Sequence, residues 1–117
     1  MTVEKISAVT LKVASMPISV RFYRDLLGLE IIYDSEDGYF SSLRAKHEKD
    51  PILNLEQGNP VTLWGRLILH VTDVDRSWAY LIEKGLHPEA PRNASWGERY
   101  FHLSDPDGHE LSFAYPI

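Results

Sequence analysis

The sequence predicts an α+β fold made of two copies of one module, each running strand, helix, strand, strand, strand. Three observations support this prediction. Residues 6–13 and 63–71 are alternating runs that align with each other, and a helical pattern follows each of them. Three further strand-like runs follow each helix. Two copies of one unit indicate mostly antiparallel strands with the helices packed on one side.

Each predicted helix has a start signal and a stop signal. In the first copy Ser15 caps the helix, Pro17 suits the first turn and Gly28 ends it. In the second copy Asp73 caps the helix and Gly85 ends it. The residues near helical spacing, which we expect to be buried, are Val20, Tyr23, Leu26, Leu27, Trp78, Leu81 and Ile82.

The remaining strands lie between turn residues. The predicted runs are 30–33, 39–44 and 52–56 in the first copy, and 87–90, 99–103 and 110–114 in the second. The DPDG segment at 105–108 predicts a hairpin turn, because Pro106 fixes its own φ and Gly108 can adopt a positive φ. We expect a single domain over 1–117, with module one at 4–58, a linker at 58–61 and module two at 62–117.

Composition narrows the class of partner. The chain has 117 residues, 44% of them apolar, and a formal charge of −5. Without a basic run it lacks the surface that nucleic acid or an anionic membrane requires. There is no cysteine, and no apolar run reaches the length of a membrane span. We therefore expect a cytoplasmic protein whose partner is a small molecule or another protein.

Three segments resemble a known family. They are VRFYRDLLGL at 20–29, the strand-to-helix passage at 65–74, and DPDG at 105–108. In this order and at these separations they resemble the vicinal oxygen chelate superfamily, the glyoxalase, bleomycin-resistance and dioxygenase group. The resemblance implies that the paired modules curve their sheets into an open, barrel-like cavity that holds the ligand. It also implies a homodimer.

The resemblance further implies a divalent metal, Fe, Mn, Ni or Zn, held by His or Gln, Glu, His and Glu from the first and last strands of the modules. Ala8, Arg66 and Ser112 stand at three of those positions. The fourth position falls to Asn54 or Glu56, which share one face of a strand. We therefore favour no metal. The weak candidates for a rearranged metal site are Glu56, His102 and Glu110.

Without a metal, the same inward positions predict a ligand site. Arg66 can pair with an anionic group, and Tyr100 and His102 can supply a ring face and a titratable donor. An alternative, compatible with the first, is that Arg66 forms an internal salt bridge with Glu56 or Glu110. The predicted ligand-binding residues are Arg66, Asn54, Glu56, Tyr100, His102, Ser112 and Trp96.

Two further sequence features have a weaker link to the site. Trp96 lies in the segment 93–99, which we expect to be a flexible loop that acts as a lid or anchors a dimer interface. Among the remaining histidines, His47, His87 and His109 are expected at the surface, and His70 at the rim of the sheet.

Two functions follow from these features. The first is binding of a small organic molecule, anionic or aromatic, without the metal that the resemblance implies. The alternative is a metal-dependent lyase, isomerase or dioxygenase with a rearranged site, or an enzyme that uses His102 and Glu110 as acid and base. The sequence leaves open whether the protein is an enzyme. We favour binding, because loss of the Lewis acid removes the main stabilisation of the transition state.

Overall fold

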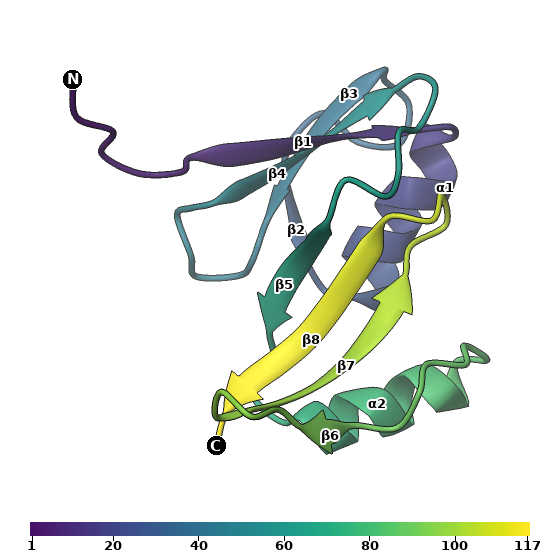
Figure 1. The fold of residues 1–117 in the computed structure, drawn as a ribbon. Helices are drawn as coiled ribbons and strands as arrows, with labels where there is room; N and C mark the ends of the chain where they lie inside the picture. The colour runs from purple at the N-terminus through teal and green to yellow at the C-terminus, as the bar shows by residue number, and fades with distance from the viewer. The chain divides into compact units, whose positions relative to one another are not determined.

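The computed structural model describes residues 1–117, and contacts between residues divide the chain into two units, Met1–Val61 and Thr62–Ile117. Each unit contains one four-stranded sheet and one helical segment (Figure 1). The elements of the first unit are β1 (Ala8–Val13), α1 (Met16–Val20), the π-helix η1 (Arg21–Leu26), β2 (Glu30–Tyr33), β3 (Phe40–Arg44) and β4 (Ile52–Gln57). Those of the second are β5 (Arg66–His70), α2 (Val74–Glu83), β6 (Arg92–Asn93), β7 (Glu98–Ser104) and β8 (Glu110–Pro116).

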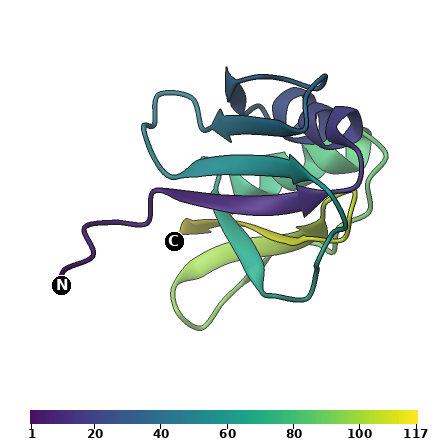
Figure 2. The same cartoon turned by 90° about the horizontal axis from the view of Figure 1, so that it is seen from above.

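The first sheet has the strand order β1-β4-β3-β2. The first and last strands of the unit, β1 and β4, pair in parallel, and the other two pairs are antiparallel. Figure 2 shows β1 running beside β4 in this sheet. Side chains alternate as the sequence predicts: Leu53 and Leu55 are buried, whereas Asn54 and Glu56 on the other face are partly exposed.

The helical segment of the first unit begins as predicted but changes its geometry. The Ser15 side chain accepts a hydrogen bond from the backbone N–H of Ile18, and Pro17 lies in the first turn. From Arg21 onward the helix widens to a π-helix, which the spacing alone did not indicate. Gly28, at φ +80°, ends the segment. Val20 and Tyr23 are fully buried, so the predicted apolar stripe forms part of the core.

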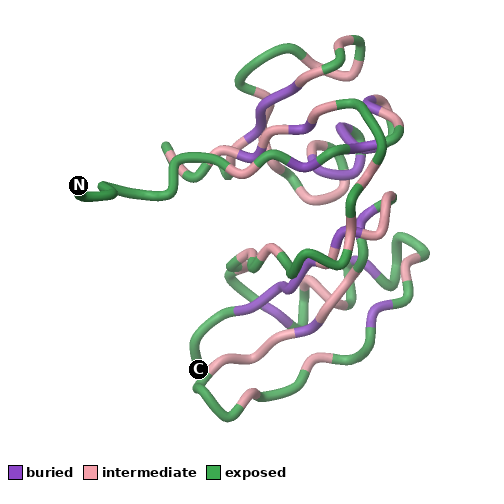
Figure 3. The backbone as a smooth tube through the Cα atoms, turned by 45° about the horizontal axis from the view of Figure 1, so that its top comes forward, coloured by how far each residue is buried: buried purple, intermediate pink, exposed green.

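The second sheet repeats the arrangement of the first, with the strand order β5-β8-β7-β6. Again the first and last strands of the unit, β5 and β8, pair in parallel. The core runs along β8, where Leu111 and Phe113 are at most 3% exposed, and Figure 3 shows this buried stretch. The prediction of two similar modules built mainly from antiparallel pairs is therefore confirmed.

Helix α2 covers one face of the second sheet and contacts β7 and β8. Asp73 caps it by accepting a hydrogen bond from the backbone N–H of Arg76, as the sequence predicts. Leu81 is buried, but Ile82 is 40% exposed, so its expected burial is wrong. None of the helices is long and apolar enough to cross a membrane.

The prediction of a strand at 87–90 is wrong, because the structure has no strand there. The edge strand β6 lies later, at Arg92–Asn93, and pairs with β7 through Arg92 opposite Tyr100. Pro88 lacks the N–H that a ladder needs, and its carbonyl accepts a hydrogen bond from Trp78 Nε1 at 3.1 Å. The segment 93–99, which we expected to be a flexible loop, is partly strand in the structure. It forms a tight hairpin between β6 and β7, closed by a 2.7 Å bond from the Ala94 N–H to the Glu98 carbonyl.

Candidate functional site

The second sheet has one face turned away from helix α2. Arg99 on β7 forms an ion pair with Asp75 on α2, so alternate β7 residues, Tyr100 and His102, lie on the other side of the sheet. Ile68 of β5, which also lies on this side, is 62% exposed. We call this side, which carries Arg66, Ile68, Tyr100, His102, Glu110 and Ser112, the open face.

Arg66 lies between two side chains of the open face. Its Nη1 donates to His102 Nε2 at 2.6 Å, and its Nη2 donates to Glu110 Oε2 at 3.3 Å. The Arg66 and Glu110 side chains are each 41% exposed. The predicted pairing of Arg66 with Glu110 is therefore present. The Glu110 carboxylate neutralises the positive charge of Arg66, a role that we had also considered for an anionic ligand.

These three residues line a cavity of about 270 Å³ in the second unit. The other lining residues are His87, Pro88, Glu89, Leu103 and Ser104. His87 and Glu89 are exposed residues from the segment between α2 and β6. The cavity thus combines charged and polar groups with an opening to solvent, a combination that suits recognition of a small polar molecule.

His102 is held in its neutral form. Burial lowers its pKa below the ordinary value of 6.5, and the positive charges of Arg66 and Arg92 lower it further, against smaller opposing effects of Glu110 and Glu89. Arg66 Nη1 lies 2.6 Å from Nε2 and 3.4 Å from Nδ1, and a guanidinium can only donate; we assign the acceptor to Nε2, the nearer nitrogen, and the proton of the neutral ring to Nδ1. His102 therefore offers one N–H donor next to the cavity.

A row of aromatic rings continues from His102 along β7. The Tyr100 ring centroid lies 5.1 Å from that of His102 and 5.8 Å from that of Trp96, which is stacked on it with an angle of 27° between the planes. Trp96 is 67% exposed, and its Nε1 donates to Glu98 Oε1 at 2.8 Å. We call Trp96, Tyr100 and His102 the aromatic row. Trp96 presents an exposed ring at one end of this row, and the half-buried Tyr100 and His102 continue it toward the cavity.

Arg92 on the edge strand β6 adjoins the aromatic row, and the sequence predictions missed it. Its Nε donates to the Tyr100 hydroxyl at 2.8 Å, and its guanidinium lies over the Tyr100 ring, 5.2 Å from the centroid. The only sequence signal was an arginine eight residues before a tyrosine. That signal acquires meaning only once the two strands are known to pair.

The equivalent face of the first sheet carries a polar network. Ser42 Oγ donates to Asn54 Oδ1 at 2.6 Å, and Asn54 Nδ2 donates to Thr10 Oγ1 at 3.3 Å. Glu56, the other candidate on this strand, lies 3.8 Å from the Lys12 ammonium. Both predicted ligand-binding residues of the first unit therefore have partners within that unit.

Strand register relates Asn54 to Ser112. In the first sheet Ala8 pairs with Ile52 and Thr10 with Asn54; in the second, Arg66 pairs with Glu110 and Ile68 with Ser112. If Ala8 corresponds to Arg66, as the aligned strands require, then Asn54 corresponds to Ser112, and Glu56 lies two residues beyond.

The donors at these four positions do not fit the metal that the resemblance implies. Ala8 has no donor atom, Arg66 carries a permanent positive charge, and Asn54 and Ser112 offer only neutral oxygens. Ser112 is moreover only 5% exposed. A divalent cation would meet no carboxylate or imidazole here.

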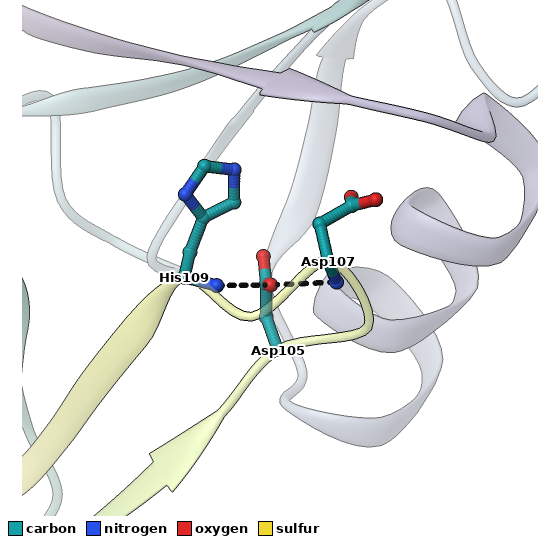
Figure 4. A group of neighbouring side chains, drawn as sticks. All are labelled: Asp105, Asp107 and His109. Carbon is teal, nitrogen blue, oxygen red and sulfur yellow. Dashed lines mark hydrogen bonds between the residues drawn. The ribbon is translucent and has the colours of Figure 1, made fainter. Parts of the chain in front are cut away.

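Another group of residues lies close enough together to hold an ion. Ligand atoms of Asp105, Asp107 and His109 all lie within 4.8 Å of one another. The DPDG turn explains the buried Asp105 carboxylate, because its Oδ1 accepts 2.9 Å hydrogen bonds from the backbone N–H groups of Asp107 and His109 (Figure 4). We assign this group to the structure of the turn.

We expected His109 at the surface, but this residue is buried, with only 1% of it exposed. Its Nδ1 accepts a hydrogen bond from Trp64 Nε1 at 3.1 Å, which satisfies part of the buried ring. Strand alternation indicated only that His109 faces away from Glu110. It could not show that this direction leads into packed surroundings. His70, expected at the rim, is 56% exposed at its side chain and lies 3.3 Å from a Glu98 carboxylate oxygen.

A family model described as the Glyoxalase/Bleomycin resistance protein/Dioxygenase superfamily matches residues 5–113. No curated protein matches the sequence. Among solved structures, a glyoxalase-related enzyme from Clostridium phytofermentans is 18% identical with a TM-score of 0.80, over 99% of this chain and 98% of that one. A superfamily member from Sphaerobacter thermophilus is 22% identical with a TM-score of 0.79, over 96% and 97%. TnmS3, an antibiotic binding protein from Streptomyces sp. CB03234, is 22% identical with a TM-score of 0.76, over 100% and 99%.

Proposed function

The chain belongs to the glyoxalase/bleomycin resistance protein/dioxygenase superfamily, and we propose that it binds a small organic molecule with a planar aromatic part on the open face of its second sheet. The observation that carries this proposal is the aromatic row, which extends from the exposed Trp96 to His102 at the edge of the 270 Å³ cavity. A ring surface next to a polar cavity suits a molecule that is apolar at one end and polar at the other.

We assign a physical role to each residue of the second unit. Trp96 and Tyr100 provide the stacking surface, and His102 donates a hydrogen bond from Nδ1 at the cavity. Ser112 lies beside His102 in the strand register, where its hydroxyl is a further polar group. Burial and, second to it, the Arg66 charge lower the pKa of His102 and favour its neutral form, and the hydrogen bond from Arg66 orients the ring.

Binding without a metal is consistent with the donors at the four positions described above. The metal-dependent alternative requires His102 and Glu110 to share an ion, yet both contact the Arg66 guanidinium, whose charge opposes a second cation at the same place. The description of TnmS3 as an antibiotic binding protein is in keeping with a binding function on this fold. We further propose that the protein is cytoplasmic and forms a homodimer; light scattering of the purified protein would test the dimer.

The proposal is tested by ligand binding to purified protein. We expect two-ring aromatic compounds to raise the melting temperature and to quench tryptophan fluorescence, and we expect Trp96→Ala and Tyr100→Ala to weaken binding about tenfold each, since a stacked ring contributes on the order of 1 kcal/mol or more. Tyr80→Ala is the matched control. Tyr80 is an exposed aromatic on α2, which covers the opposite face of the sheet.

Two outcomes would contradict the proposal. Equal loss of affinity in Tyr80→Ala would show that the aromatic row is not the site. Stoichiometric Fe, Mn, Ni or Zn in protein purified without an affinity tag, removed by chelator together with binding, would favour the metal-dependent reading instead.

A further inference from the structure

Arg92 differs from the other two arginines on strands of the second sheet in having no carboxylate partner. Arg66 is paired with Glu110, and Arg99 with Asp75 through two bonds of 2.7 and 2.8 Å. Arg92 forms no ion pair, and its one side-chain hydrogen bond uses Nε, to the Tyr100 hydroxyl. The two Nη nitrogens, which form the end of the guanidinium fork, are not used by this bond.

The geometry of Arg92 is already set by Tyr100. The hydrogen bond to the hydroxyl and the position of the guanidinium over the ring both restrict the side chain. A restricted guanidinium loses less conformational freedom when it binds a carboxylate than a free one does. Arg92 is an exposed residue, so solvent and ligands reach it.

At the His102 end of the aromatic row, positive charge outweighs negative charge. The positive charges of Arg66 and Arg92 both act on His102 more strongly than the negative charges of Glu110 and Glu89. Since Glu110 compensates Arg66, the cation left available at this end of the open face is Arg92.

We propose that Arg92 binds the carboxylate of an aromatic acid whose ring stacks on the Trp96 and Tyr100 side of the aromatic row. This inference rests on the proposed function and names its ligand class. It also places anion recognition on Arg92 in β6, whereas the sequence pointed to Arg66 in β5. The Nη atoms of Arg92 would form paired hydrogen bonds with the two carboxylate oxygens.

Three probes of one shape test the proposal: 2-naphthoate, 2-naphthylmethanol and 2-naphthylmethylamine, measured by calorimetry and tryptophan fluorescence. We expect the naphthoate to bind about tenfold more tightly than the alcohol, because a charge-assisted pair adds roughly 1.5 kcal/mol. The amine should bind more weakly than either. Raising the salt concentration should weaken naphthoate binding and leave alcohol binding unchanged.

Variants separate Arg92 from the other arginines. Arg92→Gln should remove the tenfold preference for the naphthoate over the alcohol, with a larger loss of affinity for the acid than for the alcohol. Arg76→Gln is the matched control, because Arg76 is an exposed arginine without an ion pair on α2, which covers the opposite face. It should change neither affinity. Arg92→Lys, which keeps the charge but not the fork, should restore part of the preference for the naphthoate.

The outcomes distinguish this inference from the proposed function. If Arg92→Gln leaves naphthoate affinity unchanged, or weakens the acid and the alcohol equally, the role of Arg92 is refuted while aromatic binding stands. If the amine binds best, the sign of the charge is wrong. If none of the three probes binds, both this inference and the proposed function fail.

Discussion

Replacing Arg66 by Met tests whether this residue supports the fold or tunes the site. Met has a similar length but carries no charge and no donor. The ion pair that is lost joins Arg66 Nη2 to Glu110 Oε2 at 3.3 Å, longer than an optimal charged hydrogen bond, and both side chains are 41% exposed. Exposed pairs of this kind contribute about 0.2 to 1 kcal/mol. We expect the loss of this ion pair to lower the free energy of unfolding by an amount within that range. Arg66→Met also removes the bond to His102 Nε2, so the ion pair is isolated by the double-variant comparison below.

That range corresponds to a small change in melting temperature. A chain of 117 residues that unfolds cooperatively has an unfolding entropy of about 0.25 kcal/mol/K, so a loss of 1 kcal/mol lowers the melting temperature by about 4 °C. Thermal unfolding of the wild type, Arg66→Met, Glu110→Gln and the double variant would give the coupling energy between the two side chains directly.

Arg66 and Glu110 should affect the pKa of His102 in opposite directions. The Arg66 charge lowers this pKa and the Glu110 charge raises it. Arg66→Met should therefore raise the His102 pKa, whereas Glu110→Gln should lower it further, both measured by NMR titration of the imidazole. A coupling energy above about 2 kcal/mol, outside the range of exposed pairs, or a His102 pKa that does not rise in Arg66→Met, would refute this account of the site.

Three other predictions concern the second unit. Asp105→Ala should lower the free energy of unfolding in denaturant by about 2 to 4 kcal/mol, because two backbone N–H groups lose a charged acceptor; Asp105→Asn, which keeps an acceptor oxygen, should cost less. The folded-state pKa of His102 is lowered, so the unfolded chain takes up the proton first, and stability should fall as the pH drops below the ordinary value of 6.5. His102→Asn should remove this part of the pH dependence of the melting temperature, and identical curves for the two proteins would disprove it. Phe113→Ala, at a side chain 3% exposed and stacked on Phe101 at 5.0 Å, should cost about 3 to 5 kcal/mol, and a loss below 1 kcal/mol would place Phe113 outside the core.

Much of the secondary structure was predictable because alternation and capping are local signals. The strand at Glu30–Tyr33 has the predicted bounds, and those of β7 and β8 extend the prediction by one or two residues. Ser15 and Asp73 cap their helices as the sequence indicated. These features depend on residues that are neighbours in the chain, so a single sequence contains the information.

The errors arose where partners distant in sequence decide the outcome. The Trp78 side chain, ten residues earlier in the chain, donates to the carbonyl of Pro88, and the strand β6 begins only beyond this contact, at Arg92. Trp64 lies 45 residues before His109, and no local pattern connects them. The correspondence between Asn54 and Ser112 likewise appears only in the strand register of β1 with β4 and of β5 with β8.

The site shows the same division between local and distant information. The open face of β7 and the pairing of Arg66 with Glu110 were among the alternatives drawn from the sequence. Arg92 was missed because its strand was placed too early, and only the pairing of Arg92 with Tyr100 brings its guanidinium to the aromatic row.

The strand order of each sheet constrains how the chain folds during synthesis. In both units the last strand lies inside the sheet, between the first strand and the third, so β1 and β5 have no partner until β4 and β8 have been made. The β2–β3 hairpin can form as soon as it emerges, whereas the sheet closes only when Ile52–Gln57 is available. The first unit can therefore complete its sheet while the second is still being translated. The second waits for Glu110–Pro116, and until then the unpaired edge of β5 is a place where a chaperone or another nascent chain would bind.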